Sequence, residues 1–270
     1  MAKFRTCPNC DSNTVQVRYT EEPFYVVKCR QCDLVFLGNP PDEERLYEKY
    51  YDGEDDTADL YRSDSPDHAL RELYHINRQR VQQVNDLKSH GRLLDIGCGN
   101  GFFLRSLHEY SGLAGAGIDV ADRAVQYACR EFNIDAQVAT LDDLTGRGTS
   151  YDIITLWHVL EHFTDPFYRL EQIRSLLNPE GIIICEVPNL RSLKFILSNS
   201  KWEGGNHPRY HRTFFTAGTL KRTFRSADLN QVRRLPLTYS FPWRNSWFER
   251  LKLGLNYLGL DAFLCMVGSK

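Results

Sequence analysis

Two hydrophobic periodicities alternate along the middle of the chain. Short apolar runs of strand length are separated by segments in which apolar residues return every three or four positions, as on one face of a helix. The runs predict strands at 92–97, 114–119, 135–140, 152–157 and 181–187, and the helical segments predict helices at 101–110, 121–132 and 166–177. This alternation predicts an α/β fold with a doubly wound parallel sheet, in which ligands bind at the carboxyl ends of the strands.

Further elements are expected on both sides of this core. Ser65-Pro66 places a capping residue before a proline, which predicts that a long helix begins there. After Pro188 the expected elements are, in order, a helix near 190–199, a helix from Thr216 and strands near 231–239 and 262–268. The two late strands bring the expected sheet to seven.

Composition narrows the class of protein. The 270 residues are 42% hydrophobic and 25% charged, so we expect one large domain and one small one. A net charge of −2 gives no general attraction to nucleic acid. No run of about 18 apolar residues is present to span a membrane, and the start of the chain lacks the apolar core of a signal peptide. These features predict a cytoplasmic protein.

Four of the eight cysteines have the spacing of a metal site. Cys7-Pro-Asn-Cys10 and Cys29-Arg-Gln-Cys32 are separated by 18 residues, within the range of four-cysteine zinc ribbons. Each C-x-x-C pair can turn two thiolates toward one tetrahedral ion, and a unit this small needs the metal to fold. We therefore expect residues 1–38 to form a zinc ribbon around a structural Zn²⁺, with two disulfides as the alternative.

A glycine-rich turn follows the first strand of the core. Residues 93–101 read Leu-Leu-Asp-Ile-Gly-Cys-Gly-Asn-Gly, so a ligand can lie directly on the backbone at the start of the next helix. The dinucleotide fingerprint G-x-G-x-x-G would need a glycine where Phe102 stands. Asp95 before the glycines and Asp119 at the end of the next strand suit a ligand with an amine and a ribose diol but no pyrophosphate.

This pattern resembles the S-adenosylmethionine (SAM) site of class I methyltransferases, which have a Rossmann-like sheet. The region from Tyr151 to Pro166 is similar to the fourth-strand region of a family that includes the ubiquinone-biosynthesis O-methyltransferases. Residues 207–216 are similar to that family's H-x-x-x-H…F-[ST] segment. The N-terminal cysteine pairs resemble a zinc-ribbon subgroup, some of whose relatives modify sugars or polysaccharide precursors and include nucleotide-sugar C-methyltransferases.

The resemblance implies roles for the residues of the SAM site. Asp119, which lies 22 positions after Gly97, would hold the two ribose hydroxyls with its carboxylate oxygens. Asp95 and the backbone of Gly97 and Gly99 would hold the amino-acid end of SAM.

The next two strand ends complete the implied site. The turn 140–143 would face adenine, whose edge would be read by the backbone amide of Leu141 or the carboxylate of Asp142. His158 would lie near the sulfonium or the methyl acceptor. Some ubiquinone-pathway relatives have a carboxylate at this position and bind a divalent ion there, and the histidine departs from that pattern.

A hydroxyl acceptor must lose a proton, and histidine is suited to that role near neutral pH. We expect His211 or His158 to be the catalytic base, and the other candidates are His162, His207, Glu161 and Tyr210. The spacing His158-x-x-Glu161-His162 also occurs in inverted zinc proteases, but that site needs a long helix, whereas here a strand leads into the motif.

The chain is therefore expected to have three regions. The zinc ribbon is followed by a helical linker or cap over the active site at 39–90. Residues 91–270 would form the SAM-binding methyltransferase domain, with a lid insertion at about 190–215. The segment 241–255 is expected to be an amphipathic helix that walls the acceptor pocket, packs on a partner subunit or touches a lipid-linked substrate.

These features predict a SAM-dependent methyltransferase acting on a hydroxyl of a carbohydrate, namely a nucleotide sugar or polysaccharide precursor, or of another small metabolite. An RNA methyltransferase that grips nucleic acid with its ribbon is one alternative. Basic N-terminal residues favour it (Lys3, Arg5, Arg18, Lys28 and Arg30), whereas the carboxylates of 42–56 oppose it. A non-catalytic SAM-binding adaptor is the other alternative, and the intact glycine turn with its two aspartates opposes it.

Overall fold

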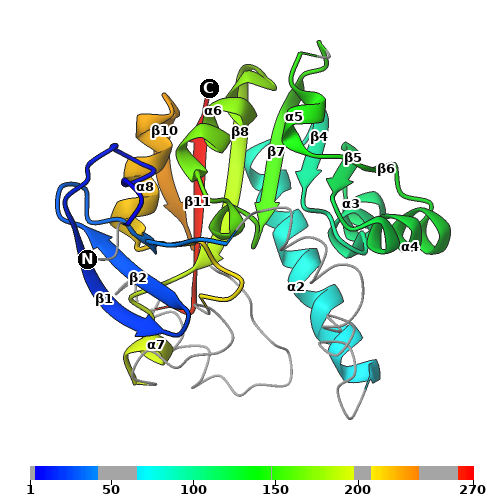
Figure 1. The fold of residues 1–270 in the computed structure, drawn as a ribbon. Coiled ribbons are helices and arrows are strands. Elements are labelled where there is room, and N and C mark those ends of the chain that lie inside the picture. The colour runs from blue at the N-terminus through cyan, green and yellow to red at the C-terminus, as the bar shows by residue number, and fades with distance from the viewer. Residues whose placement is uncertain (1–3, 42–65, 147, 198–207, 237–260) are drawn as a thin grey trace.

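The structure is a computed structural model of the 270-residue chain, in which residues 4–41, 66–146, 148–197, 208–236 and 261–270 are described (Figure 1). Within these residues, seven strands form a sheet in the order β10-β11-β8-β7-β4-β5-β6. In chain order they are β4 (Arg92–Ile96), β5 (Ala114–Asp119), β6 (Ala136–Val138), β7 (Tyr151–Trp157), β8 (Leu177–Pro188), β10 (Asn230–Leu235) and β11 (Phe263–Ser269). The expected α/β fold with a Rossmann-like seven-stranded sheet is confirmed.

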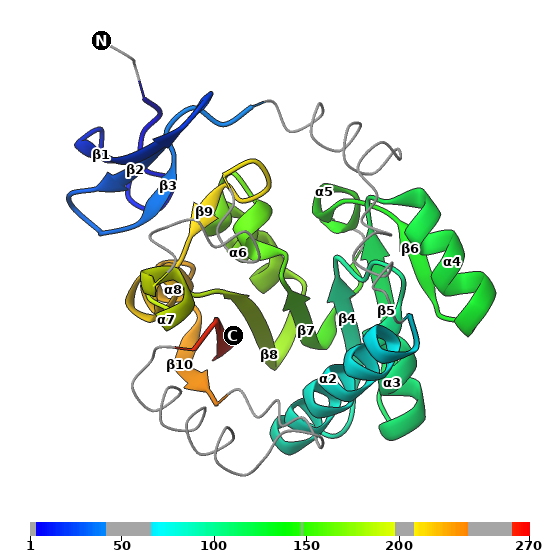
Figure 2. The same cartoon turned by 90° about the horizontal axis from the view of Figure 1, so that it is seen from below.

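Helices cover both faces of this sheet because successive side chains of a strand point to opposite faces. In β4, Leu93 packs in the core beneath α2, α3 and α4, and Leu94 packs in the opposite core with α5, α6 and α8. Figure 2 shows α2 and α3 on one side of the sheet and α6 on the other. The helices are α2 (Pro66–Leu87), α3 (Phe102–Tyr110), α4 (Asp122–Phe132), α5 (Leu141–Leu144), the 3-10 helix η2 (Leu160–His162), α6 (Pro166–Ser175), α7 (Leu193–Leu197) and α8 (Ala217–Ser226).

The sheet is mixed rather than parallel throughout. The strands from β4 to β8 run parallel to one another, as expected, but β11 is antiparallel to β8 and β10 is antiparallel to β11. The alternation had predicted a parallel sheet for the strands between 92 and 187 and had assigned no direction to the two late strands. An apolar run shows that a segment is a strand, but it does not show in which direction the strand runs.

The strand order determines where a ligand can bind. From β4 the chain adds β5 and β6 on one side, and then it returns to add β7 and β8 on the other side. The connections that follow β4 and β7 consequently lead away from each other. Such a switch point forms the ligand crevice of open α/β sheets.

A second sheet, which is antiparallel, lies beside the first. Three of its strands are N-terminal, and the fourth comes from the later part of the chain. The sheet has the order β1-β2-β3-β9, with β1 (Val15–Glu21), β2 (Phe24–Cys29), β3 (Val35–Leu37) and β9 (Thr213–Phe214). Val35 pairs with Phe214 and Phe36 with Thr213, so β9 ties the N-terminal unit to the segment that follows His211 (Figure 2). The sequence pattern had not indicated this pairing, because both strands are very short.

Several expected features lie wholly or partly outside the described residues. They are residues 42–65 of the cap, residues 198–207 of the lid, including His207, and the amphipathic segment 241–255. Within the part of the chain that is described, no helix combines the length and apolar character needed to cross a membrane.

Candidate active site

The glycine turn has the backbone shape that the sequence indicated. Gly97 and Gly99 have positive φ values of 71° and 51°, which residues with side chains rarely adopt. A Cβ on Gly97 would lie 2.4 Å from Val159 Cγ2, whereas a Cβ on Gly99 would meet no atom within 4 Å. The space over Gly99 is therefore where a ligand can approach the backbone.

Asp119 holds the glycine turn from the end of β5. Its Oδ2 accepts a hydrogen bond from the Gly99 N–H (2.8 Å), and its Oδ1 accepts one from the Ala121 N–H (2.9 Å). The N–H of Gly97 donates to the Ile118 carbonyl (2.8 Å). Both glycine N–H groups are thus used within the protein.

Asp95 lies at the end of β4 and is 2% exposed. Its Oδ1 accepts a hydrogen bond from the Thr155 hydroxyl (2.7 Å). Burial raises the pKa of Asp95 to about 7, although the Thr155 hydrogen bond and the charge of Arg80 oppose the rise. A positively charged group placed beside Asp95 would restore the carboxylate form.

The turn after β6 is fixed by hydrogen bonds of its own. Thr140 caps α5 in a capping box with Asp143. The carboxylate of Asp142 faces α6, where it accepts hydrogen bonds from Arg169 Nη1 (2.9 Å to both oxygens) and Gln172 Nε2 (2.6 Å). Of the two groups expected to face adenine, the Asp142 carboxylate is thus already engaged with α6.

His158 follows β7 and lies between two carboxylates. Its Nε2 is 3.0 Å from Glu186 Oε1, and its Nδ1 is 3.5 Å from Glu161 Oε1. Burial disfavours the charged ring, but the nearby carboxylates of Glu161 and Glu186 outweigh this effect and raise the pKa of His158 to about 9. The two carboxylates therefore favour the protonated form of this ring.

Glu161, His162 and His211 form a cluster beside His158, and we call these three residues the Glu161 cluster. Their ligand atoms lie within 4.8 Å of one another, and the two imidazole rings are edge to face at 4.9 Å. His162 Nδ1 lies 3.0 Å from the Tyr210 carbonyl, and because a carbonyl can only accept, Nδ1 is the donor.

The carboxylate of Glu161 is the most buried group of this cluster. It is 1% exposed, and among the described residues neither of its oxygens has a hydrogen-bond partner. Burial tends to raise the pKa of Glu161, but His158 and the two neighbouring histidines lower it below its usual value. The arrangement is a buried carboxylate anion surrounded by imidazoles, which can orient a base or bind a metal ion.

The sequence predicted this cluster only in part. His158, Glu161, His162 and His211 were all candidates, and the structure brings them together at the carboxyl end of β7. Glu186 was missed. The signal available was a single acidic residue inside the apolar run of β8.

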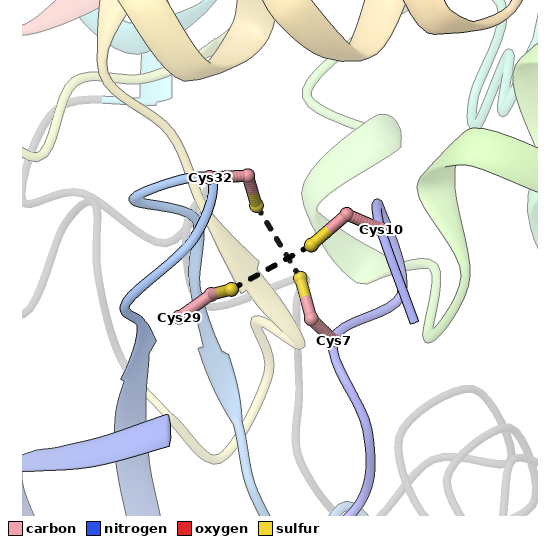
Figure 3. Close-up of side chains that lie close together, drawn as sticks. All are labelled: Cys7, Cys10, Cys29 and Cys32. Carbon is pink, nitrogen blue, oxygen red and sulfur yellow. Dashed lines mark hydrogen bonds between the residues drawn. The ribbon is translucent and has the colours of Figure 1, made fainter. Parts of the chain in front are cut away.

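The four N-terminal cysteines also converge (Figure 3). Cys7 Sγ lies 3.5 Å from Cys32 Sγ, and Cys10 Sγ lies 3.6 Å from Cys29 Sγ; all four are free thiols. Sulfurs that bind one tetrahedral zinc at 2.3 Å would be about 3.8 Å apart, so the cluster fits the ion. The hydrogen bond from Cys7 lowers the pKa of Cys32 to about 5, which favours the thiolate that zinc binds.

The seven-stranded sheet, the glycine turn after β4 and the acidic residue ending β5 define a class I SAM-dependent methyltransferase. A family model described as "Methyltransferase domain" matches residues 67–233. Because this match covers more than half of the chain, the chain belongs to that methyltransferase family.

Known proteins agree with this assignment. The chain is 29% identical over 180 residues to a ubiquinone biosynthesis O-methyltransferase of Cereibacter sphaeroides, covering 62% of this chain and 71% of that protein. A SAM-dependent methyltransferase from Thermotoga maritima has a similar fold (TM-score 0.58, 18% identity, 84% of this chain and 99% of that one). So does magnesium protoporphyrin IX methyltransferase from Synechocystis, solved with bound S-adenosylhomocysteine (SAH) (TM-score 0.56, 14% identity, 85% and 100%).

Proposed function

We propose that this methyltransferase acts on a hydroxyl group of a small molecule, and that the acceptor is a carbohydrate such as a nucleotide sugar or polysaccharide precursor. The observation that carries the proposal is the Glu161 cluster, in which a buried carboxylate faces two histidines. An O–H acceptor needs a proton acceptor of this kind. The O-methyltransferases among the relatives support the hydroxyl, and the resemblance to sugar-modifying enzymes supports the carbohydrate.

We assign SAM to the carboxyl ends of β4, β5 and β7. Asp119 would hold the ribose hydroxyls, and Asp95 with the backbone of Gly97 and Gly99 would hold the amino-acid end. Adenine would face Leu141 and Asp142. When bound, SAM supplies an activated methyl group with a good leaving group, so the protein's part is to align the acceptor and remove its proton.

His211 is our proposed catalytic base, and His158 would act near it through its charge. His158 lies between two carboxylates that favour its protonated form, and this leaves His211 as the stronger of the two expected bases. The carboxylate of Glu161 would stabilise His211 as it becomes positively charged, as an acidic residue does beside a catalytic histidine.

A second role for the same cluster is a divalent metal site. Glu161, His162 and His211 offer one carboxylate and two imidazole ligands within 4.8 Å of one another, a donor set that suits zinc and other transition metals. In that case a bound metal would lower the pKa of the acceptor hydroxyl, and His211 would be a metal ligand rather than the base. The metal content of the purified protein distinguishes the two roles.

The four cysteines are proposed to bind one structural Zn²⁺, so that residues 1–38 are a zinc ribbon. Four protein ligands leave no open position for a substrate. The segment 39–90 and the insertion at about 190–215 are proposed to cover the acceptor.

The proposal is tested by supplying SAM with a panel of acceptors and measuring SAH formation. The panel contains nucleoside diphosphate sugars, simple sugars, phenolic hydroxyl compounds and total RNA, and the methylated atom is located by NMR. Methylation of an oxygen in a sugar is the expected result, and His211→Ala should reduce that turnover by about 10²- to 10⁴-fold. Exclusive methylation of nitrogen or carbon would contradict the proposed O-methylation. Methylation of RNA would instead favour an RNA methyltransferase whose N-terminal ribbon binds nucleic acid.

A further inference from the structure

Arg212 has a fully buried side chain in the segment that joins the turn carrying His211 to β9. It is 1% exposed, and the three residues that follow it, 213–215, are buried as well. Burying a charged group is costly unless hydrogen bonds compensate for it, and a hydrophobic side chain would fill the same space without that cost. We therefore expect Arg212 to make contacts that a hydrophobic residue cannot make.

The guanidinium of Arg212 folds back onto the turn that precedes it. Its Nη1 donates to the carbonyls of Pro208 and Arg209, at 3.4 Å each. These carbonyls lie four and three residues before Arg212, so the two hydrogen bonds close residues 208–212 into a compact turn. His211 is part of this turn and directly precedes Arg212.

The backbone on both sides of His211 is bonded to the 3-10 helix η2. The Arg212 N–H donates to the Glu161 carbonyl (2.8 Å), and the Tyr210 carbonyl accepts a hydrogen bond from His162 Nδ1 (3.0 Å). The ring of His211 lies edge to face with that of His162, at 4.9 Å. These contacts set the position of the His211 ring relative to Glu161.

Arg212 also connects η2 to the N-terminal sheet. Its carbonyl accepts a hydrogen bond from the Leu37 N–H (2.9 Å), and the next residue, Thr213, pairs with Phe36 where β9 lies beside β3 (Figure 2). The Thr213 hydroxyl donates to the carbonyl of Phe163, which directly follows η2 (3.3 Å). Arg212 and Thr213 are therefore bonded both to β3 and to the region of η2.

We propose that Arg212 is a positioning residue for methyl transfer: its guanidinium shapes the turn 208–212 so that the backbone of the turn can bond to β3 and η2, and this places His211 beside Glu161. Because its side chain is buried, Arg212 acts through the turn rather than by contact with the acceptor. The N-terminal sheet, through Leu37, is then part of the support of the active site. The proposal deepens the proposed function, on which it rests for the role of His211.

The direct test is residue-resolved hydrogen exchange, measured by NMR in the SAH-bound protein, which needs no acceptor. Arg212→Met keeps a long side chain but removes the donors to the two carbonyls of the turn. The amides of Leu37 and of residue 212 should then exchange about tenfold faster or more, because hydrogen bonds from a charged group are lost. The Gly38 amide, which donates to the Tyr25 carbonyl within the N-terminal sheet (2.8 Å), should keep its wild-type rate.

Two further variants make the test specific. Arg209→Met removes an exposed arginine from the same turn and should leave the exchange of Leu37 and Arg212 unchanged. Arg212→Lys keeps the charge but lacks the planar guanidinium, so both amides should exchange at rates between those of the wild type and Arg212→Met. Faster exchange of Gly38 together with Leu37 would show a general loosening of the N-terminal sheet and would contradict the positioning role.

Wild-type exchange at both amides in folded Arg212→Met would overturn the proposal. If that variant does not fold, Arg212→Lys decides alone, and wild-type rates at both amides overturn it.

Turnover gives a second measurement once the panel has yielded an acceptor. Arg212→Met should lose roughly ten- to a hundredfold in kcat, with the KM for the acceptor and the affinity for SAH unchanged. Arg225→Met, which removes an exposed arginine of α8, should keep wild-type turnover. Failure of the panel to give O-methylation would remove the proposed function but leave the exchange result intact, so the two failures are distinguishable.

Discussion

At the scale of single residues, the two aspartates at the ends of β4 and β5, Asp95 and Asp119, differ in their hydrogen bonds and in their surroundings. Asp119 accepts two backbone hydrogen bonds and fixes the glycine turn, whereas Asp95 is buried against Thr155 with a pKa of about 7. Asp119 is proposed to accept the ribose hydroxyls of SAM, and Asp95, with its raised pKa, can change charge near neutral pH. Each of these differences predicts the outcome of a measurement of SAH binding.

SAH binding at pH 7 should release about half a proton from Asp95. The ammonium group of the ligand favours the carboxylate, so a group that is half protonated before binding becomes ionised. Calorimetry in two buffers of different ionisation enthalpy measures the release. Asp152→Asn, at the opposite end of the sheet from the site, should leave it unchanged, and binding enthalpies independent of the buffer would contradict the placement of Asp95.

The same pKa has a consequence for the unliganded protein. Because burial raises the pKa of Asp95 from 3.8 to about 7, the native state binds more protons than the unfolded state between these values. The contribution of Asp95 to stability is therefore fully present below pH 4 and is lost as the pH rises through 7.

Asp119→Ala should weaken SAH binding by about 2 kcal/mol, the range for hydrogen bonds to a charged group. The expected loss combines the ribose contacts with the support that Asp119 gives to Gly99. The control is Asp122→Ala, which removes an exposed carboxylate three residues along and should bind SAH normally. Wild-type affinity in folded Asp119→Ala would remove the ribose assignment.

At the scale of elements, the two glycines of the turn are needed for different reasons. A side chain on Gly97 would overlap the protein, whereas a side chain on Gly99 would enter open space. Both Gly97→Ala and Gly99→Ala should cost roughly 1–2 kcal/mol of stability, because both positions are left-handed. Gly97→Ala should cost more, since its methyl overlaps Val159, and Val159→Ala should recover part of that loss. Thermal unfolding of the single and double variants measures the coupling.

Gly99→Ala should instead act on the ligand. Its methyl meets no protein atom, so it would occupy the space in which we place SAM and lower SAH affinity. Normal SAH affinity in Gly99→Ala would mean that the ligand does not lie on this turn.

How far the sequence predicts an element depends on whether the element is defined by local pattern. The strand at 114–119 was predicted with the bounds that the structure has, and Thr216 caps α8 through Thr219 as the start of a helix there requires. In contrast, β3 and β9 have only three and two residues and exist through their pairing, which no local pattern encodes. Likewise, Glu186 looks like an interruption of an apolar strand until Arg80 and His158 are seen around it.

At the scale of the whole molecule, the pairing of β3 with β9 makes the N-terminal sheet part of the proposed active site. The Leu37 N–H donates to the Arg212 carbonyl (2.9 Å), and the Arg212 N–H donates to the Glu161 carbonyl (2.8 Å). Arg222 of α8 also donates to the Cys32 carbonyl. Backbone hydrogen bonds therefore connect β3 of the N-terminal sheet to Arg212, the neighbour of His211, and through Arg212 to Glu161.

Removal of zinc should consequently abolish turnover while SAH binding persists. The N-terminal sheet would depend on the proposed zinc, whereas the proposed SAM contacts lie at β4 and β5 of the seven-stranded sheet. Hydrogen exchange after chelation should speed up in β1–β3 and in β9 but not in β4. Exchange confined to β1–β3, with full turnover, would contradict the coupling.

The metal content of the purified protein tests both proposed sites together. One zinc per chain is expected from Cys7, Cys10, Cys29 and Cys32; Cys10→Ser should lower it, and Cys129→Ser, an exposed cysteine outside the cluster, should not. Two metals per chain, with Glu161→Gln returning the count to one, would show that the Glu161 cluster binds a metal and that His211 is a ligand rather than a free base. A count near zero with all four cysteines oxidised would make the N-terminal unit a disulfide fold, and the coupling to β9 would then depend on redox state instead of zinc.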